Sequence, residues 1–157
     1  MKYRSLALAL LALLPLTGMA QQRGAVAPQA QAQVQQDIDP NSILTGALHV
    51  ADLIDNGRAA EVWEGASIAA KSTVSRDAFV NQLQMARAPL GQAQSRVWLS
   101  VLRQQINPAQ GESSPLPGTY VTVRFATRFS SGKTLVELIS FRMDDNTTWR
   151  VAGYSIQ

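Results

Sequence analysis

The 157-residue chain contains no cysteine and only one histidine. Without cysteine it can form neither a disulfide bond nor a thiolate metal site, and it has no thiol to which a lipid could be attached. A single histidine excludes a multi-histidine metal site, so only a carboxylate-rich metal site would remain. We therefore predict no cofactor and no metal.

Long hydrophobic runs are also absent, apart from one near the N-terminus. Lys2 and Arg4 precede the Leu/Ala run 6–14, and small residues close the segment, which is the pattern of a cleaved secretory signal peptide. Pro15 interrupts the run, which is shorter than the ~20 residues that a membrane-spanning helix needs. We expect residues 1–20 to be a signal peptide, with no membrane span, and the mature protein to be periplasmic or secreted.

The chain has almost no excess of positive over negative charge once this segment is removed. Removal of Lys2 and Arg4 from the 14 basic residues leaves 12, against 11 acidic residues. A net charge so close to zero gives no support to nucleic-acid binding, so no nucleic-acid partner is predicted.

The rest of the chain divides into a polar segment and one domain. Residues 21–38 are rich in Gln and Ala and offer little apolar surface to offset the entropy of ordering, so we interpret them as a flexible tether. Residues 39–157 are numerous enough to build one hydrophobic core without a disulfide or metal. A single domain is therefore predicted over 39–157.

Apolar residues three and four positions apart predict three helices at the start of this domain. The first begins after Asp39, a good N-cap residue, and ends at Asn56-Gly57. The second spans 58–70. The third starts from Ser75 and ends before Pro89, whose ring is incompatible with a continuing helix.

Alternation of apolar and polar residues then predicts four antiparallel strands with short hairpins and one long loop. The first strand starts at Gln94, the loop covers 107–118, and the later strands span 120–129, 134–143 and 148–156. Helices followed by an antiparallel meander predict an α+β fold. We expect three N-terminal helices packed on one face of a four-stranded twisted sheet, as in a cystatin-like or nuclear-transport-factor-like roll.

Several short residue groups in these elements are a specific sign of a family when taken together, although each alone is a weak sign. They are Asp55-Asn56-Gly57, Val62-Trp63, Ala66-Ser67, Arg87-Ala88-Pro89-Leu90-Gly91 with Arg96, Leu116-Pro117-Gly118-Thr119-Tyr120, Phe125 with Phe129, Glu137, and Trp149-Arg150-Val151-Ala152-Gly153-Tyr154. Through these groups the chain resembles, from about Ala51 to Ile156, the bacterial exported family known as domain of unknown function 4019. The resemblance implies export and the fold, but no reaction, because the family has no established activity.

Glu137 is the main candidate for a functional residue. It alternates in phase with three apolar residues of its predicted strand, so we expect its carboxylate to point inward with them. A buried carboxylate needs a cation, and the candidates are Arg96, Arg124 and Arg128. We favour a structural ion pair over the alternative, a ligand pocket in which Glu137 and an arginine are the polar groups.

Two further groups have functional and structural interpretations. His49 and Asp52 lie three residues apart on a predicted helix and could form an oriented general base, but a solvated surface pair is the favoured interpretation. Residues 144–146, Asp-Asp-Asn, could contribute to a calcium loop, yet a plain turn is favoured. Arg87 is explained as a cation at a helix C-terminus.

Three hypotheses about function follow. The leading one is an exported, non-catalytic domain that binds a protein partner or a small apolar ligand. The second is a roll-fold enzyme, isomerase-like or hydrolase-like, with Glu137 or the His49/Asp52 pair as the base in an apolar cone. The third is a homodimeric assembly module that pairs sheet to sheet through the face carrying Trp98 or Arg124.

Overall fold

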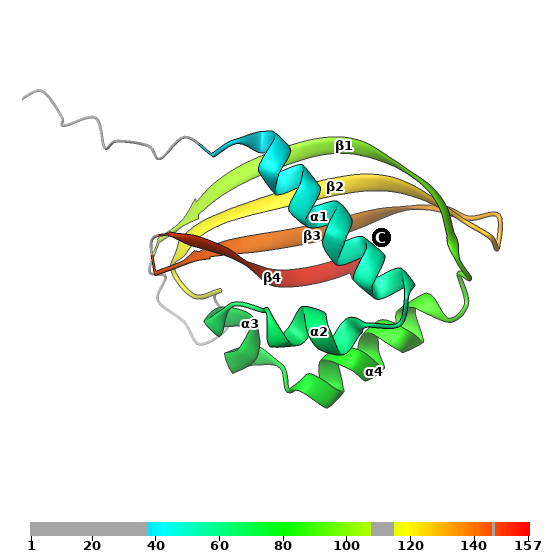
Figure 1. Ribbon diagram of the computed structural model, residues 1–157, viewed down its shortest axis with the longest axis horizontal. Helices are drawn as coiled ribbons and strands as arrows, with labels where there is room; N and C mark the ends of the chain where they lie inside the picture. The colour runs from blue at the N-terminus through cyan, green and yellow to red at the C-terminus, as the bar shows by residue number, and fades with distance from the viewer. Residues whose placement is uncertain (1–37, 108–114, 146) are drawn as a thin grey trace, which may run out of the picture. The chain divides into compact units, whose positions relative to one another are not determined.

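The computed structural model describes residues 38–107, 115–145 and 147–157, and in them four helices precede four strands (Figure 1). The helices are α1 (Pro40–Asp55), α2 (Ala59–Glu64), α3 (Ile68–Thr73) and α4 (Arg76–Arg87). The strands are β1 (Ala93–Ile106), β2 (Gly118–Phe129), β3 (Thr134–Asp144) and β4 (Thr148–Ile156). The predicted signal peptide, the tether up to residue 37 and residues 108–114 of the predicted loop lie outside these ranges.

Helices α1 and α4 begin where the sequence predicts. The Asp39 carboxylate accepts hydrogen bonds from the backbone N–H groups of Asn41 and Ser42 at the start of α1. The Ser75 hydroxyl oxygen accepts one from the Ala78 N–H at the start of α4. Both side chains satisfy N–H groups that have no partner inside the helix, which is why these helices start there.

The prediction of one helix over 58–70 is wrong, because the structure divides this segment into α2 and α3. Between them, Ala66 forms a parallel bridge with Val151 of β4, and the Ser67 N–H donates to the Val151 carbonyl at 2.8 Å. The Ser67 hydroxyl oxygen then caps α3 by accepting from the Ala70 N–H. Pairing with a distant strand therefore breaks the helix, and no local helical pattern reveals it.

The sheet is open and antiparallel, with strand order β1-β2-β3-β4, as the predicted meander requires. The hairpin between β2 and β3 closes through Gly132, whose φ of 83° lies in the left-handed region that glycine tolerates. Register shifts occur in β1, near residues 93–95 and 98–100, and in the β3–β4 pair next to Ser140. The assignment to a cystatin-like or nuclear-transport-factor-like roll stays a prediction.

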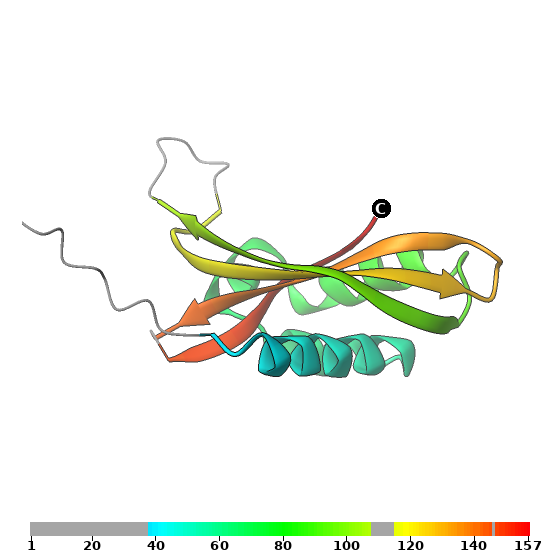
Figure 2. The same cartoon turned by 90° about the horizontal axis from the view of Figure 1, so that it is seen from above.

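Residues of α1, α2 and α4 share one hydrophobic core with inward residues of the sheet, so these helices cover the same face, as predicted. Helix α1 lies across this face, and α2, α3 and α4 gather beside β4 (Figures 1 and 2). The core is formed where inward residues of β2, β3 and β4 meet α1, α2 and α4. Its fully buried members include Ala47, Val121, Val123, Phe125 and Ile139.

Candidate functional site

Six polar side chains from two helices and all four strands meet at one point under α1. Asp55 is the last residue of α1, and Arg87 is the last residue of α4. The strands contribute one residue each: Arg96 from β1, Thr127 from β2, Glu137 from β3 and Tyr154 from β4. We call these six residues the Glu137 network.

Glu137 is completely buried and receives five hydrogen bonds. Its Oε1 accepts from Arg87 Nη1 at 2.6 Å, from the Tyr154 hydroxyl at 2.5 Å and from Arg96 Nη2 at 3.3 Å. Its Oε2 accepts from Arg96 Nε at 2.6 Å and from the Thr127 hydroxyl. A carboxylate has about four lone-pair positions, so Glu137 has no free acceptor capacity.

Asp55 closes the network from the α1 side. Its Oδ2 accepts from Arg96 Nη1 at 2.6 Å, and its Oδ1 accepts from Arg96 Nη2 at 2.9 Å and from Arg87 Nη2. Each arginine therefore bridges both carboxylates. Two acids and two arginines give no net charge, which is the condition under which buried ions can be tolerated.

Local structure positions the two arginines. The Arg87 guanidinium lies 4.8 Å from the centre of the Phe129 ring, in cation–π geometry. Between Arg87 and Arg96 the chain turns at Gly91, where φ is +71° and an added Cβ would collide with Ser130 Oγ. The Leu90 carbonyl and the Gln92 N–H also bond to the β2–β3 hairpin. This close contact between the turn and the hairpin holds the end of α4 and the start of β1 over the sheet.

The pKa values in the network favour the charged carboxylate and arginine and the protonated tyrosine. Burial by itself would raise the pKa of Glu137, but hydrogen bonds from Arg96, Thr127 and Tyr154, together with the Arg96 charge, outweigh it and lower the pKa below its usual value. Burial, followed by the neighbouring Glu137 charge, raises the pKa of Tyr154. Burial lowers the pKa of Arg96, but its bonds to Asp55 and Glu137 reverse the effect and raise it.

The structure brings together only some of the predicted cations. Arg96 contacts Glu137, whereas Arg124 and Arg128 are exposed and lie in the alternate positions of β2, opposite Leu138 and Thr134 of β3. The strand-face argument correctly placed Glu137 inward. It missed Asp55, Arg87, Thr127 and Tyr154 as partners. All of these except Thr127 belong to the residue groups that carry the family resemblance.

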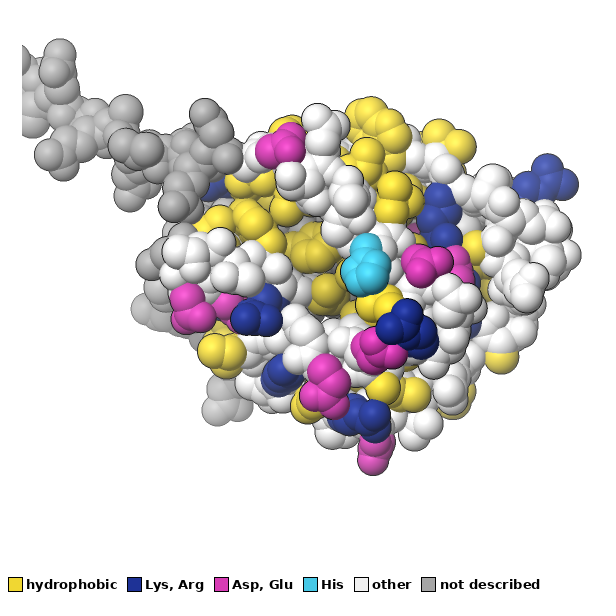
Figure 3. All heavy atoms as spheres, in the orientation of Figure 1, with side chains coloured by type: hydrophobic (Ala, Val, Ile, Leu, Met, Phe, Trp, Pro, Cys, Tyr) yellow, Lys and Arg dark blue, Asp and Glu magenta, His cyan; other side chains and the backbone are white. Residues whose placement is uncertain are grey.

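His49 and Asp52 do not form an oriented pair in the described structure. Both are exposed, and the Asp52 carboxylate accepts instead from Asn56 Nδ2 at 3.1 Å. Figure 3 shows the single histidine side chain on the surface of the face drawn. His49 and Asp52 are therefore solvated surface groups, which is the interpretation favoured from the sequence.

Asp144 does more than form the predicted turn. It ends β3, is 2% exposed, and accepts from the Ile68 N–H of α3 at 3.0 Å and from Arg142 Nη1. Arg142 Nη2 in turn donates to the Pro117 carbonyl at 2.8 Å. Asp145 has the left-handed backbone expected of a turn, with φ of 53°, and Asn146 lies outside the described residues. In the described ranges no three acidic or histidine side chains are arranged to hold a metal ion.

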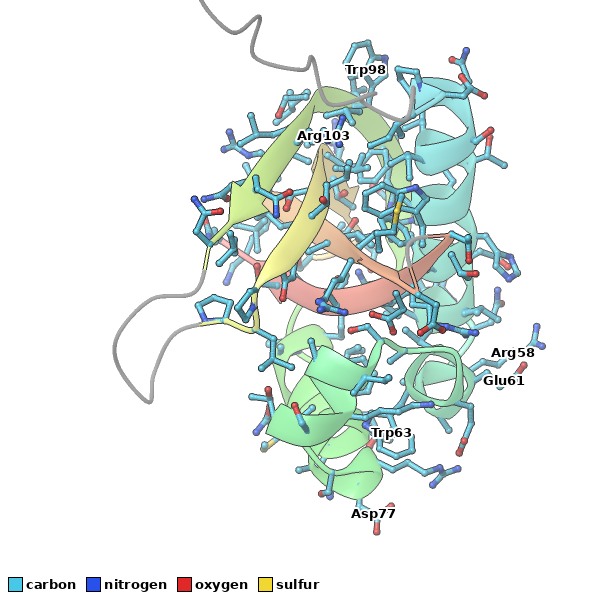
Figure 4. The ribbon with its side chains drawn as sticks, turned by 90° about the vertical axis from the view of Figure 1, so that its left-hand side faces the viewer. Arg58, Glu61, Trp63, Asp77, Trp98 and Arg103 are labelled. Atoms are coloured by element: carbon cyan, nitrogen blue, oxygen red, sulfur yellow. The ribbon has the colours of Figure 1, made fainter. Side chains whose placement is uncertain are left out.

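Two adjoining hollows lie between β4 and the helices beside it. Their volumes are about 260 and 230 Å³, and Phe79, Gln82 and Tyr154 line both. The first continues towards Ala86 and Ile156, and the second towards Trp63 and Val74. Figure 4 shows Trp63 on the helical side of this region. We call the combined depression the β4–α4 groove.

The fold and the network define an α+β domain whose open antiparallel sheet is tied to two helix ends by a largely buried, neutral cluster of ions. A family described as "Protein of unknown function (DUF4019)" matches residues 46–154, and the chain belongs to this family. The match confirms the resemblance, and it contains all six members of the Glu137 network. No curated protein matches the chain. Of the helices in the described residues, none is long and apolar enough to cross a membrane.

Proposed function

We propose that this chain is an exported, non-catalytic domain that binds an extended segment of a protein partner in the β4–α4 groove. Export is inferred from the signal-peptide pattern of residues 1–20. The observation that carries the binding proposal is the groove itself, which runs beside an edge strand and is lined mainly by apolar side chains.

The hydrogen bonds of the proposed catalytic residues favour binding over catalysis. A general base needs a free lone pair within reach of a substrate proton. Glu137 is fully buried and its lone pairs are occupied by five donors. Asp52 is bonded to Asn56 instead of orienting His49. These groups therefore support the structural interpretation of the network, with Tyr154 held in place as part of the groove wall.

The backbone of β4 supports an extended peptide rather than a compact ligand. Gln157 exchanges two hydrogen bonds with Val136 of β3, both at 2.9 Å. In an antiparallel pair, only every second residue of a strand exchanges hydrogen bonds with the neighbouring strand. Since Gln157 bonds to β3, Ile156 and Tyr154 direct their N–H and C=O groups away from β3. In the described residues these groups have no backbone partner on that outer side. A peptide that adds as a fifth strand would satisfy them.

The lining defines the side chains that such a peptide would present. The rings of Phe79 and Tyr154 and the side chain of Leu83 offer apolar contact, and the Gln82 amide offers hydrogen bonds at the rim. Gly153 has open space where a side chain would stand. Successive residues of a strand point to opposite faces, so the fitting peptide has apolar residues at alternate positions.

The test uses the protein purified after expression of the full chain and a displayed library of random twelve-residue peptides. Enriched peptides are synthesised and their affinity is measured by titration. In Gln82→Trp a bulky ring would fill the groove from an exposed position, and Gln84→Trp is the matched control on the same helix, outside the lining. We expect alternating apolar peptides whose affinity falls at least tenfold in Gln82→Trp and is unchanged in Gln84→Trp.

Hydrogen exchange and mass spectrometry complete the test. A bound peptide should slow exchange at the amides of Tyr154 and Ile156, and the purified protein should begin at Gln21. Failure to enrich any peptide, or equal binding by both tryptophan variants, would refute the groove as the binding site. A product that retains residues 1–20 would refute export. A turnover lost in a folded Glu137 variant would instead establish the enzyme hypothesis.

A further inference from the structure

Strand β1 carries a row of exposed apolar side chains at the opposite edge of the sheet from the groove. Val97, Trp98, Leu99 and Leu102 are 63%, 58%, 48% and 59% exposed. Figure 3 shows hydrophobic side chains along the upper margin, where Figure 1 places β1. Figure 4 shows Trp98 at the end of the molecule away from α2, α3 and α4. This concentration on one strand is uncommon, since exposed apolar residues are normally scattered.

The row flanks an unpaired sheet edge. β1 has a single neighbour, β2, and no described backbone group bonds to its outer side between residues 94 and 106. Leu102 lies opposite Thr122 of β2, on the face away from the core, whereas Trp98 lies opposite the buried Phe125. The apolar side chains therefore project on both faces of the sheet. Packing of a second sheet against one face would cover only part of them, but an added strand would cover both sets.

Strand β1 carries too few free charges to prevent another strand from pairing with its edge. Natural edge strands usually avoid pairing by carrying charged residues or proline. The only charged residues of β1 are Arg96 and Arg103, and Arg96 is bonded to Asp55 and Glu137. One protective feature is present, a register shift between Trp98 and Ser100. Beyond it, the ladder with β2 is regular from Ser100 to Ile106.

The regular part of β1 is complementary to itself. We propose that two copies of this chain pair antiparallel through their β1 edges, with the twofold axis at Leu102, to form a continuous eight-stranded sheet. In this register Leu102 meets its own copy and Ser100 meets Gln104, which pairs apolar with apolar and polar with polar at these positions, whereas Leu99 meets Gln105. Arg103 lies opposite Val101 of the second copy instead of opposite a second arginine. A closed twofold dimer needs such a self-complementary surface.

The absence of native cysteine allows a direct test of the axis. In Leu102→Cys the two introduced thiols would lie opposite each other, at a Cα separation of roughly 4.5 to 5.5 Å, which a disulfide can span. In Val97→Cys each thiol would lie five residues from the axis, which places the pair about 30 Å apart. We expect rapid oxidative cross-linking of Leu102→Cys into a dimer and none for Val97→Cys.

Light scattering measures the oligomeric state without a cross-link. We expect the purified protein to have twice the monomer mass, and Leu102→Lys to weaken the dimer at least tenfold. Met85→Lys is the control, because Met85 is 70% exposed on α4, away from β1. A monomeric wild type at millimolar concentration would overturn the proposal. So would a dimer that survives Leu102→Lys, or equal cross-linking of both cysteine variants.

This inference is independent of the proposed peptide groove, because β1 and β4 are opposite edges of the sheet. Leu102→Lys should leave peptide affinity unchanged, and Gln82→Trp should leave the dimer intact. Failure of one proposal therefore leaves the other to be judged by its own measurement.

Discussion

Replacement of Glu137 by glutamine tests whether the fold depends on this carboxylate to compensate the charges of Arg87 and Arg96. The variant keeps the size and shape of the side chain but removes its charge, so the two arginines face Asp55 alone. The new amide group would also point hydrogen-bond donors at existing donors. Removing one partner of a buried ion pair costs about 3–5 kcal/mol, because the remaining charge stays buried without compensation. We expect Glu137→Gln to lower the free energy of unfolding by that amount at pH 7.

Urea denaturation measures this loss. For a domain of this size, with an m-value of about 1.5 kcal/mol/M, the midpoint should fall by about 2–3 M. Glu61→Gln is the matched control, since Glu61 forms an ion pair with Arg58 in which both side chains are about half exposed, and its midpoint should hardly change. A midpoint for Glu137→Gln within about 0.5 M of the wild type would refute the reasoning.

Acid should reproduce the effect of the mutation. The pKa of Glu137 is lower in the folded protein than in the unfolded chain, where a glutamate has a pKa of about 4.3. Its contribution to stability is therefore fully present above the unfolded pKa and is lost as the pH falls through the folded pKa. The difference in unfolding free energy between wild type and Glu137→Gln should be constant near neutral pH and shrink below about pH 4. A difference that is the same at pH 7 and pH 3 would contradict this assignment.

Three other substitutions check the surrounding structure, each by thermal or urea unfolding. Gly91→Ala should cost about 2 kcal/mol or more, because its positive φ disfavours a side chain and the new Cβ would collide with Ser130; an unchanged Tm would disprove the close contact. Asp144→Ala should cost about 2–3 kcal/mol, since it removes the acceptor for the Ile68 N–H and leaves a guanidinium unpaired. Arg128→Ala should change stability by less than about 0.5 kcal/mol, because this arginine is exposed; a larger loss would place it in a structural contact that the geometry lacks.

The candidate site was only partly predictable. Alternation along residues 134–143 was enough to place Glu137 inward, and Arg96 was among its three proposed partners. Asp55 and Arg87 are separated from Glu137 by 82 and 50 positions in the sequence and reach it from helix ends. A periodic pattern identifies the buried side of an element but not the element that will pack against it. The residue groups of the family resemblance included both residues, but no local pattern indicated that they share a role with Glu137.

The sequence by itself determined the order of helices and strands, the caps of α1 and α4, the hairpin between β2 and β3, and the inward face of β3. These features depend on neighbours within a few positions, where backbone preferences and side-chain alternation act directly. Only the tertiary structure decided the break between α2 and α3, the placement of three helices beside β4, and the partners of Glu137. Each of these depends on contacts between residues far apart in the chain, such as Ala66 with Val151, whose energies no local pattern records.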